Sequence, residues 1–407
     1  MHRFHPRSPR IASAWMLVAA ATLSSCGQKS SPTAPQSTGI ILTVASMGPV
    51  PGATDVAVTT TFTAKFSEAI DPATATTGSF TVYDGGTPVR GRVTASDSTV
   101  TFTPRMPLRT SATYTASVTT GLRSKSGGAL ASGRTWTATT EAGQSLGGII
   151  SASTTLSLAG SPYTLTSNVQ VAYGATLTIE PGVVLDGQGR RIEVFGSLAA
   201  VGTANQPVTF HGARLVPGAN APSQPFSITL QHALVDGGSI YGATGNAVYG
   251  SLVLRDSRLV GVQDYFYVWY PVADCWIERN VFVSCGGFST GSTDGVKIHV
   301  RNNVFHDQTT AYAVENWAAY STSEAIVELN SFLSTDRVAL SLPTGYTSAK
   351  LTATNNYWGS TSVASINAMI FDQNDDLGSN AVITYQPILT APDVATPDPA
   401  PWISPGP

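Results

Sequence analysis

The chain has 407 residues, of which 42% are hydrophobic and 12% are charged, and its formal net charge is −3. At roughly 150 residues per domain this length predicts two or three domains, and a charged fraction near half the ordinary ~25% argues against a disordered chain. The small net charge argues against a nucleic-acid-binding surface, and three cysteines are too few for a disulfide framework. Abundant Thr, Ser, Val and Gly without a helical repeat predict an all-β protein.

Residues 1–25 have the pattern of a signal peptide. Three arginines precede an apolar run over 11–23 that is shorter than the ~20 residues needed to cross a bilayer. The run ends in LSSC (23–26), which resembles the cleavage box of bacterial lipoproteins. The resemblance implies that Cys26 carries lipid, and Gly27 after it implies anchoring to the outer membrane, on the periplasmic or the surface side. An ordinary secretory signal is the alternative. Residues 26–40, rich in Ser, Thr, Pro and Gln, predict a flexible tether.

Residues 41–140 predict a β-sandwich, because short alternating runs are separated by turn signals such as DGG (84–86) and SGG (126–128). The segments FSEAIDPAT (66–74), TVTFTPRMPL (99–108), SATYTASV (111–118) and TWTATT (135–140) resemble bacterial immunoglobulin-like (Ig-like) domains of surface proteins. The resemblance implies a spacer without a chemical role, in which the Tyr114 hydroxyl tethers the preceding loop. This segment carries eight basic and five acidic residues, whereas 141–407 carries ten basic and twenty acidic ones, so a second domain follows.

A repeat dominates that second domain. A pattern of apolar, any, apolar, any, any, Asn recurs, and its last positions are 232, 257, 280, 303, 330 and 356, separated by 25, 23, 23, 27 and 26 residues. A large apolar residue stands two positions after each of them. A period near 25 with strand-like alternation is typical of a β-solenoid, in which three short strands and three turns make one coil.

Equivalent residues of successive coils should lie above one another at the ~4.8 Å spacing of paired strands. Asn280, Asn303, Asn330 and Asn356 then form a ladder of stacked amides at a sharp turn, whose left-handed backbone Asn tolerates. The aromatic residues two positions later should stack in the core. VRNNVF (300–305), ATNNYWG (353–359) and VAYGATLTIEPGVVLDG (171–187) resemble right-handed parallel β-helix proteins. The resemblance implies a domain of roughly ten coils over 147–390.

The end of the chain predicts a cap followed by a disordered tail. The segment from NDD (374–376) to YQPIL (385–389) resembles the closing segment of β-helix proteins, which protects the last coil from aggregation. Six prolines within 391–407 cannot join a sheet, so this tail is expected to be disordered. Oxygen ligands for a structural calcium ion could come from Asp372, Asn374, Asp375 and Asp376, with a solvated turn as the alternative. No other cofactor is predicted.

Catalysis is considered because pectin lyases, polygalacturonases, adhesins and phage tailspikes share the β-helix fold. STDGVKI (292–298) resembles the polygalacturonase motif Asn-Thr-Asp-Gly-x-Asp and makes Asp294 a candidate acid, but Lys297 stands where the second Asp belongs. A lyase needs a calcium-binding carboxylate cluster with Arg or Lys, and no cation pattern accompanies Asp264, Asp294 and Glu315. We therefore expect a non-catalytic protein, with a polysaccharide hydrolase or lyase that uses Asp294 or Glu315 as the alternative.

An aromatic run indicates a binding site. In YFYVWY (265–270), strand alternation points Tyr265, Tyr267 and Trp269 outward when Phe266 and Val268 face the core. A coil or two later, YAVENW (312–317) places Glu315 and Trp317 outward and Tyr312 inward. Exposed aromatics beside acids and amides stack on the faces of neutral sugars, so the five outward residues predict a glycan-binding surface. The alternative is that a loop or the Ig-like domain covers them.

The two remaining cysteines, Cys275 and Cys285, lie ten residues apart. Export permits a disulfide between them, but positions on different faces of one coil disfavour it. Taken together, the sequence predicts a lipid-anchored, monomeric envelope protein that displays a non-catalytic β-helix to a polysaccharide or another surface partner. A purely structural envelope protein or adhesin is the third possibility.

Overall fold

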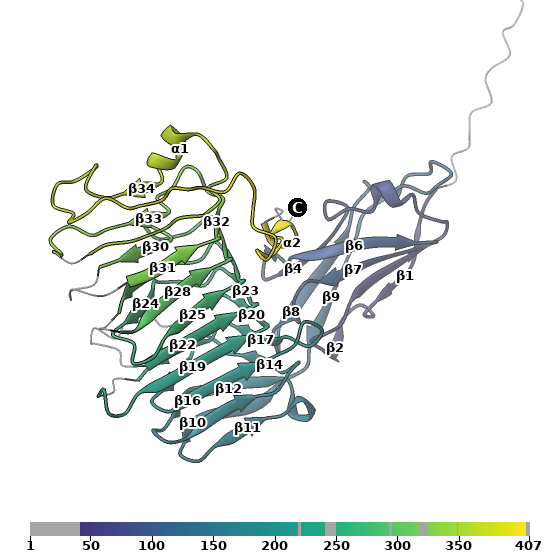
Figure 1. The fold of residues 1–407 in the computed structure, drawn as a ribbon. Helices are drawn as coiled ribbons and strands as arrows, with labels where there is room; N and C mark the ends of the chain where they lie inside the picture. The colour runs from purple at the N-terminus through teal and green to yellow at the C-terminus, as the bar shows by residue number, and fades with distance from the viewer. Residues whose placement is uncertain are drawn as a thin grey trace, which may run out of the picture. The chain divides into compact units, whose positions relative to one another are not determined.

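The computed structural model describes residues 41–403, except 219–220, 241–249, 293–294, 318–323 and 348. Residues 1–40, and with them the predicted signal peptide, Cys26 and the tether, lie outside the described residues, and so does Asp294. The described chain forms a β-sandwich followed by a parallel β-solenoid, which confirms the predicted all-β fold class (Figure 1). None of the helices in these described ranges is long and apolar enough to span a membrane.

The sandwich consists of two sheets with the strand orders β1-β3-β7-β6 and β2-β9-β8-β4-β5. Neighbouring strands are antiparallel except for β2 and β9. The elements are β1 (Val44–Gly48), β2 (Ala53–Val56), β3 (Phe62–Phe66), a 3-10 turn η1 (Pro72–Thr74), β4 (Phe80–Asp84), β5 (Thr87–Pro88), β6 (Gly91–Ser96), β7 (Thr99–Pro104), β8 (Thr113–Val118) and β9 (Arg134–Thr140).

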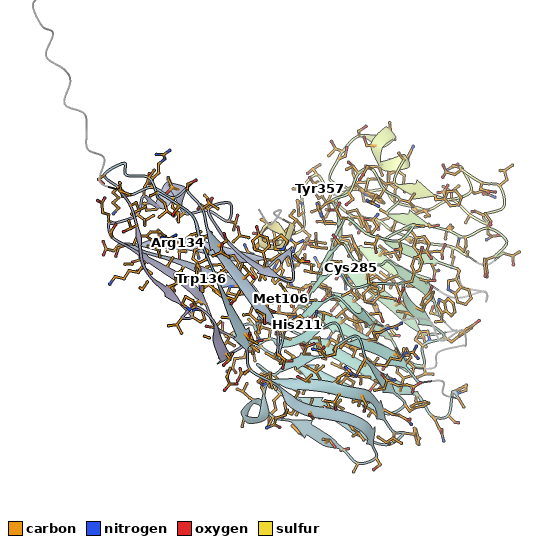
Figure 2. The ribbon with its side chains drawn as sticks, turned by 180° about the vertical axis from the view of Figure 1, so that it is seen from behind. Met106, Arg134, Trp136, His211, Cys285 and Tyr357 are labelled. Atoms are coloured by element: carbon orange, nitrogen blue, oxygen red, sulfur yellow. The ribbon has the colours of Figure 1, made fainter. Side chains whose placement is uncertain are left out.

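Strand alternation builds the core of the sandwich. Along β9, Arg134 is exposed and Trp136 is buried; both are labelled in Figure 2. The Trp136 ring packs against Phe80 with the ring centroids 5.7 Å apart. At the start of β8, the buried Tyr114 hydroxyl accepts a hydrogen bond of 2.9 Å from the backbone N–H of Arg109, which is the tether that the Ig-like resemblance implied.

The solenoid winds through three faces, and each face is a stack of parallel strands. Face A is β11 (Thr154–Leu156), β13 (Thr176–Ile179), β16 (Ser197–Val201), β19 (Phe226–Gln231), β22 (Gly250–Arg255), β25 (Cys275–Glu278), β28 (Lys297–Arg301) and β31 (Glu324–Glu328). Face B is β14 (Val184–Asp186), β17 (Val208–His211), β20 (Ala233–Asp236), β23 (Arg258–Val260), β26 (Val281–Val283), β29 (Val304–His306) and β32 (Ser331–Phe332).

Face C begins with β15 (Arg191–Val194), β18 (Arg214–Pro217) and β21 (Ser239–Ile240), and continues with β24 (Phe266–Trp269), β27 (Phe288–Gly291), β30 (Val314–Asn316), β33 (Leu340–Ser341) and β34 (Ile370–Phe371). A bridge between Ser239 and Gln263 joins its two parts. The first coil also contains β10 (Gln144–Ile150), the turn η2 (Leu158–Gly160) and the long β12 (Tyr163–Val171), which pairs with both β14 and β15. The eight described strands of face A correspond to about eight turns rather than the roughly ten expected, because residues beyond 358 close the solenoid with α1 (Val363–Asn367).

The four predicted asparagines form one column inside the solenoid, and each is fully buried. The Oδ1 atom of Asn303 accepts hydrogen bonds from both N and Nδ2 of Asn280, at 3.0 and 2.9 Å, and the same pair of bonds joins Asn303 to Asn330 and Asn330 to Asn356. Each Nδ2 also donates to a backbone carbonyl of face A, such as Leu254 O for Asn280. The amide ladder thus satisfies buried backbone groups at the turns that follow face A in these coils.

Two details of the predicted ladder are wrong. The left-handed backbone belongs to the residue before each rung, since φ is positive at Asp256, Arg279, Asn302, Leu329 and Asn355 rather than at the rungs. His232 also has a φ of 47°, so it is equivalent to these turn residues, and the rung of its coil is the next residue. That residue is Ala233, whose backbone N–H donates a hydrogen bond of 3.0 Å to Ser257 Oγ. The repeat therefore starts one position later than the sequence pattern indicated.

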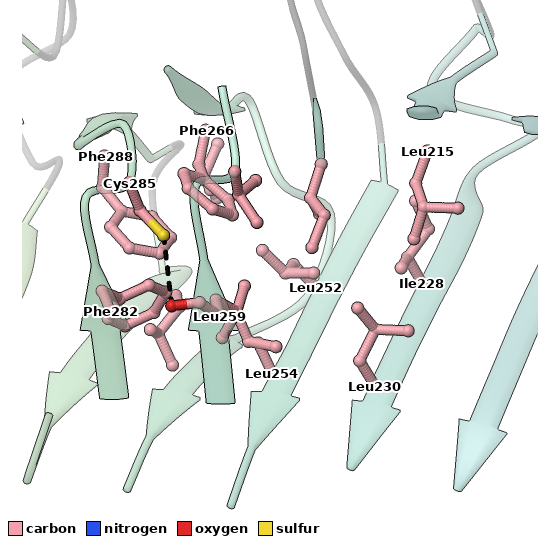
Figure 3. Close-up of a cluster of buried hydrophobic side chains, with 14 of the residues drawn as sticks. Leu215, Ile228, Leu230, Leu252, Leu254, Leu259, Phe266, Phe282, Cys285 and Phe288 are labelled. Atoms are coloured by element: carbon pink, nitrogen blue, oxygen red, sulfur yellow. Dashed lines mark hydrogen bonds between the residues drawn. The ribbon is translucent and has the colours of Figure 1, made fainter. Parts of the chain in front are cut away.

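Aromatic rings fill the core beside the ladder. Phe282, Phe305 and Phe332 lie in one column with centroids 5.0 and 5.3 Å apart and near-parallel planes, and Trp358 continues the column at 5.1 Å. Figure 3 shows Phe282 together with Phe266, Phe288 and the leucines of neighbouring coils. Cys285 lies in the same cluster, where its Sγ contacts the carbonyl oxygen of Leu259 at 3.3 Å. Both Cys275 and Cys285 are buried and free.

The proline-rich C-terminal segment is ordered over 391–403, contrary to the expectation of a disordered tail. Asn302 Nδ2 donates to Asp393 Oδ1 at 2.8 Å, and the Thr396 hydroxyl donates to the carbonyl oxygen of Leu329. The segment ends in the helix α2 (Ala400–Ile403), from which Trp402 packs on outward valines of face B. Polar anchors and one apolar contact hold this segment in place although its prolines cannot join the sheet.

Candidate functional site

Four strands of face C bring one polar column to the outside of the solenoid. Phe266, Phe288, Val314 and Leu340 are aligned and point inward, with none of them more than marginally exposed. Strand alternation therefore turns the next residues outward, in the column Tyr267–Ser289–Glu315–Ser341. Trp269 is aligned with Gly291, two positions further along.

The aromatic rings around this column touch one another in an unbroken row. Its order is Tyr312, Tyr265, Tyr267, Trp269 and Trp317, with centroid separations of 4.9, 5.7, 4.8 and 5.2 Å. We call these five residues the aromatic face. Each ring is half-buried, so each still presents part of its surface to solvent. Tyr270 and Tyr346 extend the row, because each lies 5.7 Å from Trp317.

Tyr312 points outward, so the prediction that it faces the core is wrong. It precedes β30, and Ala313 and Val314 occupy the inward positions instead. The Tyr312 hydroxyl donates to Glu315 Oε2 at 2.6 Å, and the Ser341 hydroxyl lies 3.5 Å from Glu315 Oε1. Burial raises the pKa of Glu315 above its ordinary value although these hydrogen bonds oppose the shift, and burial together with Glu315 raises the pKa of Tyr312.

Small residues make room for the two tryptophans. The Trp317 ring covers Gly291, where an added Cβ would lie 3.0 Å from the Cε2 and Cζ2 atoms of the indole. The Trp269 Nε1 atom donates to the buried Ser289 hydroxyl at 3.2 Å. This hydrogen bond holds the Trp269 indole, and packing on Gly291 and on neighbouring rings holds that of Trp317, so both are ordered before any ligand arrives, which lowers the entropy cost of binding.

A groove of about 760 Å³ runs from the aromatic face toward the earlier coils of face C. It is lined by Tyr265, Tyr267, Thr309 and Thr310 at one end and by Arg191, Glu193 and Arg214 at the other, with Ser239, Gln263 and Asp264 between them. Its volume lies within the ~300–1,000 Å³ typical of ligand sites. The sequence pattern did not reveal this groove, because its residues come from coils that are far apart in the chain.

The other candidate sites have structural explanations or lie outside the description. The Asp372 carboxylate is buried and accepts hydrogen bonds from the backbone N–H groups of Asn374 and Ile383, at 2.8 Å each. One oxygen of Asp375 accepts from the N–H of Asp372, and one of Asp376 accepts from that of Gly378. In the described ranges no group of three or more His, Cys, Asp or Glu residues is arranged to hold a metal ion. These carboxylates stabilise a turn.

A hydrolase of the inverting type requires two carboxyl groups that are far enough apart to leave room for the attacking water molecule. Glu315 is in place on face C, but Asp294 lies outside the described residues, so this pairing stays a prediction. The chemistry available on the described face is stacking and hydrogen bonding. Aromatic planes, the Tyr267 hydroxyl and the oxygens of Glu315 can contact a ligand that is apolar on its faces and polar at its rim.

Comparison with known proteins assigns the sandwich. Residues 39–140 match the family model described as a bacterial Ig-like domain. Parts of the chain are similar to three solved S-layer structures: rSbsC(31-844), the N-terminal part of the bacterial S-layer protein SbsC, and SbsC domains 1–6. Identities are 26, 24 and 23%, over 25, 26 and 28% of this chain and 14, 24 and 16% of those chains, each with a TM-score of 0.20. The chain thus spans less than a quarter of those proteins, and the search of curated proteins gives no match.

The family match and the described fold together define a bacterial Ig-like domain followed by a parallel β-solenoid of about eight turns.

Proposed function

We propose that this chain is a surface-displayed, non-catalytic protein whose solenoid binds a glycan on the aromatic face. The unbroken row of half-exposed rings from Tyr312 to Trp317 carries the proposal. Single exposed aromatics are ordinary on protein surfaces, whereas a contiguous and prearranged group usually marks a binding site. Sugars suit it, because their rings offer flat apolar faces surrounded by hydroxyl groups.

The electrostatics of the aromatic face favour a largely uncharged ligand segment. The pKa of Tyr267 and of Tyr312 is raised by burial, so both phenols stay neutral at physiological pH. The carboxyl group of Glu315 is held between two hydroxyl groups, Tyr312 and Ser341, and its oxygens are suited to accept hydrogen bonds from sugar hydroxyls.

The test is retention of the purified protein on immobilised neutral and acidic polysaccharides. Trp269→Ala and Trp317→Ala should each weaken retention about tenfold, since a ring contact contributes up to ~1.5 kcal/mol. Trp276→Ala is the matched control, because Trp276 is a half-buried outward indole on face A, stacked on His299 at 3.8 Å. Absence of retention on every polysaccharide, or retention that neither variant on face C changes, would contradict the proposal.

Display at the envelope forms the second part of the proposal. The LSSC box supports lipidation at Cys26, and the Ig-like domain with the preceding tether would hold the solenoid away from the membrane. Cys26→Ser should move the protein from the membrane fraction to the soluble fraction of cells that express it. A variant that still sediments with membranes would exclude this mode of anchoring.

A further inference from the structure

Two arginines at the far end of the groove are stacked on adjacent coils without a carboxylate partner among the described residues. Arg191 and Arg214 are aligned on adjacent coils, and the next residues, Ile192 and Leu215, are buried, so both guanidinium groups lie on the outer side of face C. Three arginines elsewhere in the solenoid are paired with carboxylates at 2.7–2.9 Å: Arg255 with Glu278, Arg279 with Asp256, and Arg301 with Glu328. Among the described residues, neither Arg191 nor Arg214 forms such an ion pair.

The groove joins these arginines to the aromatic face at a fixed distance. The column Arg191–Arg214–Ser239–Gln263 advances by one coil at each residue. At ~4.8 Å for each step, Arg191 lies about 14 Å and Arg214 about 10 Å from the coil of the tyrosines along the solenoid axis. A glycan of several sugar units that lies along this axis therefore reaches both ends of the groove.

We propose that the groove binds a sugar carboxylate of the same glycan through Arg191 and Arg214, while neutral sugars stack on the aromatic face. This inference rests on the proposed function and specifies its ligand class: a mostly neutral glycan that carries a uronic acid at one position. The planar guanidinium group matches a carboxylate with two parallel hydrogen bonds, and unpaired arginines on neighbouring coils offer that geometry without breaking an existing ion pair.

The acidic residues of the groove disfavour a ligand with many negative charges. Glu193 lies two residues after Arg191 and is aligned with Val216 instead of an arginine, and Asp264 lies at the bend before Tyr265. With Glu315 further along face C, these carboxylates oppose a ligand that is charged on every sugar. A lone carboxylate opposite the arginines avoids this repulsion, and Glu193 and Asp264 accept hydrogen bonds from hydroxyl groups of neighbouring sugars.

Titration calorimetry with three probes tests the inference: a neutral oligosaccharide that the column assay has identified, the same oligosaccharide with one terminal uronic acid, and an oligouronate of equal length. The uronate-bearing probe should bind about tenfold more tightly than the neutral one, and raising the salt concentration should reduce this difference. The oligouronate should bind more weakly than the probe with a single acid. The double variant Arg191→Gln/Arg214→Gln should bind the neutral and uronate-bearing probes equally, because the preference for the acid is lost.

Arg337→Gln is the matched control, because Arg337 is exposed in a turn of the same domain and forms no ion pair among the described residues. It should retain the tenfold preference. Equal binding of the neutral and uronate-bearing probes to the unaltered protein overturns this inference alone, since neutral binding then still supports the aromatic face. Tightest binding of the oligouronate also overturns it, and lack of binding by all probes removes both proposals.

Discussion

Replacing Asn303 by alanine measures what the amide ladder contributes to stability. The side chain makes four hydrogen bonds of 2.8–3.0 Å: its Oδ1 accepts from N and Nδ2 of Asn280, and its Nδ2 donates to the Ile277 carbonyl oxygen and to Oδ1 of Asn330. At ~1 kcal/mol net for each bond, Asn303→Ala should lower the free energy of unfolding by about 4 kcal/mol. The loss is not recovered from water, because Asn280 is fully buried and its N–H is left without an acceptor.

Ser257, which lies in the same column, allows the loss of stability to be compared at a residue with fewer hydrogen bonds. Its hydroxyl makes two hydrogen bonds in the same column, accepting from Ala233 N at 3.0 Å and donating to Arg255 O at 2.7 Å. Ser257→Ala should therefore cost about 2 kcal/mol, half the cost of Asn303→Ala. Asn374→Ala, at an exposed asparagine, should stay within ~0.5 kcal/mol of the unaltered protein.

Urea unfolding monitored by circular dichroism gives the three values. Asn303→Ala should also lower the melting temperature by about 8–16 °C, at ~2–4 °C for each kcal/mol in a domain of this size. If Asn303→Ala costs no more than Asn374→Ala, the ladder bonds are not stabilising and the argument fails. If Ser257→Ala lowers the free energy of unfolding more than Asn303→Ala does, the number of hydrogen bonds lost does not determine the loss of stability.

Three other predictions follow from single contacts. Tyr114→Phe removes the hydrogen bond to the N–H of Arg109 and should destabilise the Ig-like domain by ~1 kcal/mol, measured by thermal unfolding; an unchanged melting temperature would show that the tether is dispensable. Burial raises the pKa of the Cys275 and Cys285 thiols to about 12, so iodoacetamide at pH 8 should alkylate both only after denaturation, as mass spectrometry can show. The folded-state pKa of Glu315 is raised, so the folded protein binds more protons than the unfolded chain between the unfolded value, about 4.3, and the folded one. Stability should therefore fall as pH rises through this window, and Glu315→Gln should remove that part of the pH dependence; identical pH profiles would disprove it.

The solenoid could be predicted because its buried column accepts few residue types. A rung must present both a donor and an acceptor to its neighbours, and Asn280, Asn303 and Asn330 meet that requirement identically, so the repeat is visible in the sequence. The rung at Ala233 has no polar side chain, so the sequence pattern indicates the neighbouring His232 instead. The positive φ of His232, the alignment of Leu234 with Arg258 and the hydrogen bond from Ala233 N to Ser257 Oγ establish the register there.

The candidate site could be predicted only in part, because alternation applies within a strand and fails beside one. Tyr267 and Trp269 lie inside β24 and have the orientation that the alternation predicts, whereas Tyr312 precedes β30 and does not. Arg191 and Arg214 lie more than 50 residues before Tyr267 in the sequence, and only the winding of the chain brings them into one groove with it. The order of the C-terminal segment could not be predicted either, because the residues that hold it, Asn302 and Leu329, are distant from it in the sequence.

The ladder makes the length of this solenoid adjustable in whole units. Removal of residues 281–303 would join Asn280 to Val304, the residue that follows Asn303, and Asn280 would then stand directly beneath Asn330. The shortened version loses Asn303 and Phe282 but keeps Asn280 as a rung, and Phe305 then stands two positions after it. Duplication or loss of a coil between Arg214 and Tyr265 would move the two ends of the groove apart or together in increments of ~4.8 Å, which offers evolution or an engineer a simple way to alter ligand length.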